Sequence, residues 1–338
     1  NKEKNMKISY FKFLTSFLML ALIISLFSCR PGPKIPVAGQ ARGQDMLTLL
    51  PAETSAFIVA NWNQIMNQRL VQKAIAEEKE LQPYRQKAEA FFNPEQDLFF
   101  VALAMTGEIK KPLENLVLLT NLKYDQQKLV PESDPDSTLK NYEEIPYFPF
   151  IETEGFEACL AFLDDSNLAL GSEKAIKKVI DTYKGKTPNL LSQPEIKPYL
   201  KDINMNALTF TWLTLPAELL REETSENPVL QLAKKVRYIS SFSDYRQPNY
   251  LTELKVYAED KKDHQQIAET LTGLKALGLG LSGETPEIGQ ALDSLEITSS
   301  EKYVKIFISL NEELLEKLKR TWQEKNLKSK SKETDQEI

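Results

Sequence analysis

Histidine is almost absent from this sequence, since His264 is the only one among 338 residues. A metal site built from several histidines is therefore excluded, and a Ser-His-Asp catalytic site would have to use this one residue. His264 stands beside Asp263 in a polar stretch, which predicts a solvated surface side chain. No other residue pattern indicates catalysis, so we expect no catalytic residue, no cofactor-binding residue and no metal ligand.

Cysteine and net positive charge are also scarce. The two cysteines, Cys29 and Cys159, are too few for a disulfide framework. Cys159 lies in an apolar run, which predicts a buried structural thiol. Acidic residues outnumber basic ones by 48 to 42, giving a formal net charge of -6. Nucleic acid is not expected as a partner, because phosphate binding needs a concentrated basic face.

The chain also lacks an uncharged stretch long enough to span a bilayer. Its longest candidate, residues 13–27, has about 15 residues, whereas a membrane-spanning helix needs roughly 20. Lysines precede this stretch, so residues 1–28 are predicted to be a signal peptide. An ordinary secretory signal that is cleaved elsewhere, or an uncleaved anchor, is the alternative.

The end of this stretch, Leu26-Phe27-Ser28-Cys29, resembles the bacterial lipobox. Leu26 and Ser28 match the cleavage context, and the resemblance implies that Cys29 is lipidated and becomes the mature N-terminus. Several acyl chains would hold the protein stably, at about 0.8 kcal/mol per buried CH₂. Pro31 stands where an enteric inner-membrane lipoprotein carries Asp. We therefore expect an extracytoplasmic, lipid-anchored protein, in the outer membrane rather than the inner one.

Residues 29–48 are predicted to be the lipidated cysteine followed by a flexible tether, because prolines and glycines interrupt them. A first α+β unit is predicted over 49–185. It combines apolar or alternating runs typical of strands with a helix that Ser172 caps and Gly185 ends. The strands are predicted at 57–61, 98–105, 116–122, 147–151, 156–163 and 168–170. The polar segment 125–144 is predicted to be a surface excursion.

A similar unit is predicted over 206–322, after a connector at 186–205. It opens on an alternating strand at 208–212 and continues with short helices, two hairpins and further helices. Asn311 is predicted to cap the last helix, in the position equivalent to Ser172. The residues beyond it, 323–338, are charged and aperiodic, which is typical of a disordered tail. The predicted fold class is therefore α+β, with two similar units, each an antiparallel sheet covered by helices.

Two segments together resemble a bacterial extracytoplasmic family known only as a domain of unknown function. The first is Leu50-Pro51-Ala52-Glu53-Thr54 before a strand, and the second is Leu168–Ile176 with its Gly171-Ser172 pair. The family has an L-P-A-[DE]-T opening and duplicated α+β units. The resemblance covers most of 49–320 and implies an extracytoplasmic duplicated fold, but no activity. The second half lacks the Leu-Pro opening.

Three further motifs match catalytic or nucleotide-binding patterns only by their letters. Residues 137–140 and 299–302 fit S-x-x-K, but no K-T-G partner accompanies them. Residues 278–283 fit G-x-G-x-x-G, which binds a pyrophosphate only between a strand and a helix. Here the motif follows a predicted helix, so Gly278 is interpreted as its C-terminal cap.

These patterns favour a non-catalytic envelope protein that binds or organises another protein. The alternative is a binding module for a small apolar or glycan ligand in a cleft between the units, near 186–206. A scaffold predicts an exposed apolar surface, a binding module predicts a pocket, and an enzyme predicts a cleft with perturbed carboxylates. Membrane attachment is expected through the lipid alone, and the oligomeric state stays open.

Overall fold

The computed structural model describes residues 42–77, 86, 89, 91–109, 111–129, 139–153, 156–215 and 228–334. The predicted signal peptide, 1–28, lies outside the described residues, as do its cleavage context, Leu26 and Ser28, and the lipidation site Cys29. No helix within the described ranges has both the length and the apolar character needed to cross a membrane. The chain divides into two compact units. The first runs to Thr214 and includes Ser240–Phe242, and the second contains the remainder.

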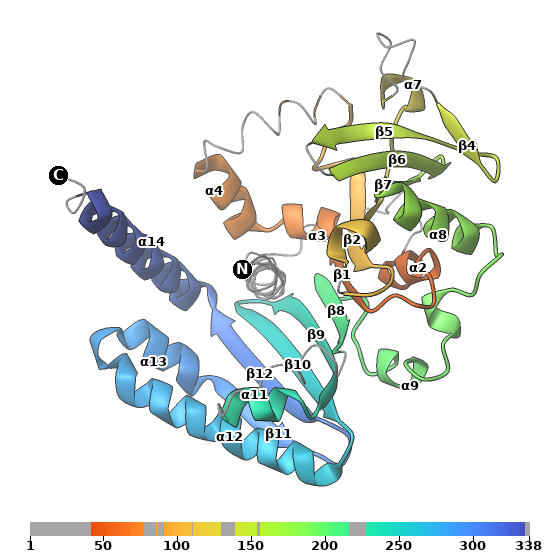
Figure 1. Ribbon diagram of the computed structural model, residues 1–338. Coiled ribbons are helices and arrows are strands. Elements are labelled where there is room, and N and C mark those ends of the chain that lie inside the picture. Colours follow the sequence, from red (N-terminus) through yellow and green to blue (C-terminus); the bar gives the residue numbers. More distant parts are fainter. Residues whose placement is uncertain are drawn as a thin grey trace. The chain divides into compact units, whose positions relative to one another are not determined.

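The first unit is organised on an antiparallel sheet with the strand order β8-β1-β2-β3-β7-β6-β5-β4 (Figure 1). Its strands are β1 (Ala56–Asn61), β2 (Leu98–Met105), β3 (Leu116–Leu122), β4 (Lys140–Tyr142), β5 (Ile145–Thr153), β6 (Phe156–Asp164), β7 (Asn167–Gly171) and β8 (Thr209–Thr214). Strand β1 is buried along nearly its whole length, as its unbroken apolar sequence predicts. The mixed α+β class predicted from the sequence is confirmed.

Short helices surround this sheet. They are α2 (Gly43–Thr48), α3 (Trp62–Met66), α4 (Arg69–Glu77), α6 (Pro112–Asn115), α7 (Gln126–Leu129), α8 (Glu173–Tyr183), the 3₁₀ turn η2 (Leu190–Ser192) and α9 (Lys197–Leu200). Helix α8 packs on β3, β6 and β7 with its apolar face. Its residues Ala175, Ile176, Val179 and Ile180 are fully buried. The predicted stop at Gly185 is confirmed, because its φ of 72° is a conformation that favours glycine.

The second unit contains strands that follow one another in the order β11-β12-β10-β9. Its elements are α11 (Pro228–Ala233), β9 (Val236–Arg246), β10 (Asn249–Ala258), α12 (Lys261–Leu281), η3 (Ser282–Glu284), α13 (Pro286–Asp293), β11 (Leu295–Ser299), β12 (Val304–Asn311) and α14 (Glu312–Thr334). Helix α12 packs on β10, β11 and β12, while α13 packs against both α12 and α14 (Figure 1). The small core of the second unit is formed by Leu232, Val256, Ile267 and Val304.

The strand order shows the duplication. In the first repeat the neighbours run β1-β2-β3-β7-β6, and in the second they run β8-β9-β10-β12-β11, which is the same path. Each repeat then ends in a helix that the preceding residue caps. The Ser172 hydroxyl accepts the Ala175 N–H at 3.1 Å, and the side-chain oxygen Oδ1 of Asn311 accepts the Leu314 N–H at 2.8 Å. The two predicted caps are confirmed.

Three segments expected to lack regular structure are ordered instead. Residues 43–48 of the predicted tether form α2, because Met46 and Leu47 are buried in the first unit. In the predicted connector, Leu190 is fully buried, and Asn189 bridges to Pro51. The compact first unit therefore continues through this segment to Thr214.

The third segment is the predicted disordered tail, which begins at residue 323. The backbone of α14 continues without interruption through Thr334. The polar sequence lacks apolar periodicity there, but lysine and glutamate favour a helix even without a buried face.

The predicted surface excursion, 125–144, needs a smaller correction. Its described residues include the short helix α7 and the edge strand β4, which pairs with β5. Residues 130–138 lie outside the described part of the chain.

Candidate functional site

An apolar surface distinguishes the helices of the second unit. We define this apolar helix surface by five side chains, which are Leu274, Leu277 and Leu281 on α12, Ile288 on α13 and Trp322 on α14. Leu281 is 84% exposed, Trp322 is 67% exposed and Leu277 is 66% exposed. Single exposed leucines are common on protein surfaces, but several on helices that pack together are typical of an interaction surface.

The local sequence explains why these leucines stay exposed. Helix α12 has 21 residues, yet only His264 and Ile267, both in its first half, are buried. Residues 276–283 carry no charge and consist of leucine, glycine, alanine and serine. Gly278 lies inside this helix, which continues to Leu281, so the predicted cap at Gly278 is wrong. Since the G-x-G-x-x-G match lies in the end of a helix and a 3₁₀ turn, it does not have the strand-to-helix setting of a phosphate loop.

His264 is buried, contrary to the expected solvated side chain. It is 2% exposed, and its Nε2 accepts the Ala258 N–H at 3.0 Å. Burial lowers the pKa of His264, and the negative charge of Asp263 opposes that shift only in part. The neutral ring therefore acts as a structural acceptor at the end of β10, where it joins α12 to the strand.

Among the described carboxylates of the first unit, Glu173 at the start of α8 has a strongly lowered pKa. Its Oε1 accepts hydrogen bonds from Lys177 at 2.8 Å and from the Tyr147 hydroxyl at 2.9 Å, and its Oε2 lies 3.4 Å from the Lys140 ammonium. Hydrogen bonds, first from Lys177 and then from Tyr147, lower the pKa of Glu173 to about 2. Glu173 is therefore ionised over the physiological pH range and links β4, β5 and α8.

Glu173 also belongs to a group of three potential metal ligands within the described ranges. Oxygen atoms of Glu157 and Glu173 and the sulfur of Cys159 lie within 4.8 Å of one another. Burial raises the pKa of the Cys159 thiol to about 11, so the thiol keeps its proton. Two lysines already compensate Glu173. The arrangement therefore favours an ion-pair network over a metal centre, and the predicted buried thiol at Cys159 is confirmed.

The fold and the exposed helices together define a duplicated α+β chain with an apolar surface on its second unit. No family model matches the sequence, and no curated protein matches it. Among solved structures, crystal forms of the protein TP0453 are similar at 12% sequence identity. Form I has a TM-score of 0.45 and form III one of 0.47, and each alignment covers 83% of this chain. The alignments cover 99% and 97% of those chains, respectively.

Proposed function

We propose that this chain is a lipid-anchored, non-catalytic protein of the bacterial envelope that binds a partner protein through the apolar helix surface. The observation that supports protein binding is the exposure of Leu277, Leu281 and Trp322 on helices of one unit. Tryptophan is enriched among the residues that dominate binding energy at protein interfaces. The proposal rests on a surface and assigns no residue to a reaction.

The magnitude of the apolar effect favours an interface. Full burial of a leucine side chain contributes roughly 1.5–3 kcal/mol to the free energy of association. Leu277 and Leu281 make this contribution only when a partner covers them. Ordering and association oppose this gain, so a partner must cover several of the five side chains at once. The five side chains lie on three helices of which α12 packs against α13 and α13 against α14.

The charge of α14 indicates the partner's chemistry. Between Lys317 and Lys332 the sequence has seven lysine or arginine residues and a single acid, Glu324, although the whole chain is acidic. A sequence rich in basic residues around the exposed Trp322 suits an apolar protein segment flanked by acidic residues. We propose this chemistry for the partner.

The location is proposed from the N-terminal sequence. The lipobox-like Leu26-Phe27-Ser28-Cys29 supports lipidation at Cys29 after cleavage of 1–28. Pro31 favours the outer membrane over the inner one, and the Leu50–Thr54 and Leu168–Ile176 motifs support membership of the bacterial extracytoplasmic family. The Cys29→Ser variant should lose metabolic labelling by fatty acid. Labelling that persists in this variant would overturn the anchor.

Protein binding is tested by crosslinking in cells followed by native mass spectrometry of the released complex. The double variant Leu277→Glu/Leu281→Glu places two charges on the apolar helix surface without emptying a core. Leu113→Glu is the matched control, because Leu113 is a 53% exposed leucine in the first unit. We expect a single partner at fixed stoichiometry, reduced at least tenfold by the double variant and unchanged by the control. Equal yields from all three proteins would contradict the proposal.

A further inference from the structure

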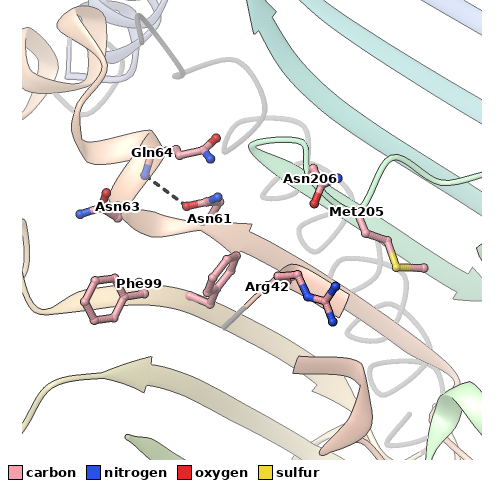
Figure 2. Close-up of a pocket in the computed structure, with 9 residues that line it drawn as sticks. Arg42, Asn61, Asn63, Gln64, Phe99, Met205 and Asn206 are labelled. Atoms are coloured by element: carbon pink, nitrogen blue, oxygen red, sulfur yellow. Dashed lines mark hydrogen bonds between the residues drawn. The ribbon is translucent and has the colours of Figure 1, made fainter. Parts of the chain in front are cut away.

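A small pocket lies within the first unit, where four segments meet (Figure 2). Its volume is about 200 Å³. The polar lining comes from the residue before α2, the β1–α3 junction and the loop before β8, and it comprises Arg42, Asn61, Asn63, Gln64 and Asn206. The apolar lining comes from Phe99 and Phe100 on β2 and from Met205. The pocket includes part of the region near 186–206 where a binding module was expected, and its lining combines four carboxamide side chains with apolar ones.

The carboxamides are oriented by contacts that leave part of their capacity unused. The side-chain oxygen Oδ1 of Asn61 accepts the Gln64 backbone N–H at 3.2 Å, which directs the side-chain amide nitrogen of Asn61 away from that contact (Figure 2). Asn63 donates to the Glu95 carbonyl at 3.2 Å. The Asn204 side chain accepts the Asn206 backbone N–H at 3.1 Å and so fixes the turn that presents Asn206. Within the described part of the chain, the side-chain amides of Gln64 and Asn206 make no hydrogen bond.

The charges around the pocket select against ions. None of the nine described residues that line it carries a carboxylate, so a cation has no ligand of the usual kind. Arg42 supplies the only positive charge in that lining, and its guanidinium lies 3.4 Å from the Asp45 carboxylate. What remains is a set of neutral groups, each with a donor and an acceptor side by side.

The pocket's size and floor narrow the ligand class further. Pockets that hold drug-sized ligands have volumes of roughly 300–1,000 Å³, so this smaller pocket suits a single small ring. Neighbouring hydroxyl groups on such a ring match a carboxamide, which donates and accepts at adjacent atoms. The apolar face of the ring can lie against the small exposed parts of Phe99 and Phe100, which both line the pocket. The pairing of β2 with β3 shifts register between Leu98 and Phe100, an irregularity that is common beside binding sites.

We propose that this pocket binds one neutral sugar residue or a comparable cyclic polyol, with Gln64 and Asn206 as hydrogen-bonding residues. This site is separate from the apolar helix surface, and it does not depend on the proposed protein binding. The crosslinking experiment could therefore yield no partner protein while the sugar binds. A partner protein could equally be found while no sugar binds, so the two proposals fail independently.

The test is saturation-transfer NMR and calorimetry on the full chain with glucose, N-acetylglucosamine and myo-inositol as probes. The Gln64→Ala/Asn206→Ala double variant removes two exposed side-chain amides and leaves the Asn61 contact intact. Gln290→Ala is the matched control, because it removes an exposed amide from α13 in the second unit. Circular dichroism verifies that all three proteins are folded.

We expect at least one probe to bind the wild type and the control equally, and to bind the double variant at least tenfold more weakly. No binding of any of the three probes to the wild type would overturn the proposal. Equal binding to the double variant would overturn it as well, because the sugar would then bind elsewhere.

Discussion

The two repeats follow the same strand path but use their helices differently. In the first repeat, α8 has 11 residues, and Ala175, Ile176, Val179 and Ile180 on it are fully buried. The equivalent helix of the second repeat, α14, buries Leu314 and Leu315, but this repeat also has α12 and α13 between β10 and β11. Helix α12 has 21 residues and buries two, and α13 buries none. The helix that ends each repeat therefore buries apolar residues, while the two additional helices of the second repeat keep apolar side chains in solvent. The two repeats therefore share the strand path and a partly buried final helix, and they differ in the helices between the third strand and the last two.

The largest predicted difference separates a buried side chain from an exposed one of similar size. Ile176→Ala should lower the free energy of unfolding by roughly 2–5 kcal/mol, because it leaves a cavity under α8. Leu277→Ala should change it by no more than about 0.5 kcal/mol, since Leu277 is largely exposed. Urea denaturation followed by circular dichroism measures both values. Equal losses would mean that Leu277 supports the fold and not an interface.

The helix caps sharpen the comparison at the next level. Asn311→Ala should cost about 1 kcal/mol through the lost bond to the Leu314 N–H. Ser172→Ala should cost more, because the Ser172 hydroxyl also donates to the Glu114 carbonyl at 2.6 Å. The same denaturation measurement ranks the two variants. If Ser172→Ala lowered the free energy of unfolding less than Asn311→Ala, the bond to the Glu114 carbonyl would add nothing to the Ser172 cap.

Acid should affect the second repeat through His264. Its pKa is lowered in the folded protein by burial, so the unfolded chain binds a proton more readily. The stability that neutral His264 supplies is complete above its ordinary pKa of about 6.5 and is lost as the pH falls through the lower folded value. His264→Gln should be less stable at pH 7.5, but its stability should change less between pH 7.5 and 5. Parallel pH profiles for the two proteins would exclude this role.

The smallest expected effect is a gain at the glycines of α12. Gly273 and Gly280 have open space where a side chain would start, so Gly273→Ala and Gly280→Ala meet no neighbour. Each should stabilise by roughly 0.5–1 kcal/mol, the difference in helix propensity between the two residues. Gly43→Ala is the contrasting variant, because its side chain would come within 2.5 Å of the Met205 carbonyl oxygen. Thermal denaturation should show gains for the first two variants and a loss for the third.

Local sequence predicted the strands well and the exposed elements poorly. Runs such as Ala56–Asn61 and Leu98–Met105 are apolar because both faces of the sheet are buried there. This signal lies within the run itself, so it can be seen in the sequence. The caps at Ser172 and Asn311 are local too, since each bonds to a backbone three residues onward. The α+β class and the duplication follow from these signals.

The remaining features depend on contacts that are distant in sequence. The sequence neighbours of His264 are polar, but His264 is buried against the end of β10, where it accepts the Ala258 N–H. The pocket joins Arg42, Gln64 and Asn206, which no sequence pattern connects. The exposed Leu277 and Leu281 were visible as apolar residues, but only the fold shows that the core does not cover them.

The central claim is that the apolar helix surface of the second repeat is covered by a protein in the cell. A photo-crosslinking amino acid placed at position 277, and separately at position 113, tests it most directly. We predict a discrete protein adduct from position 277, with its site in an apolar segment flanked by acidic residues, and no such adduct from position 113. Adducts to lipid alone, or the same adducts from both positions, would contradict the claim.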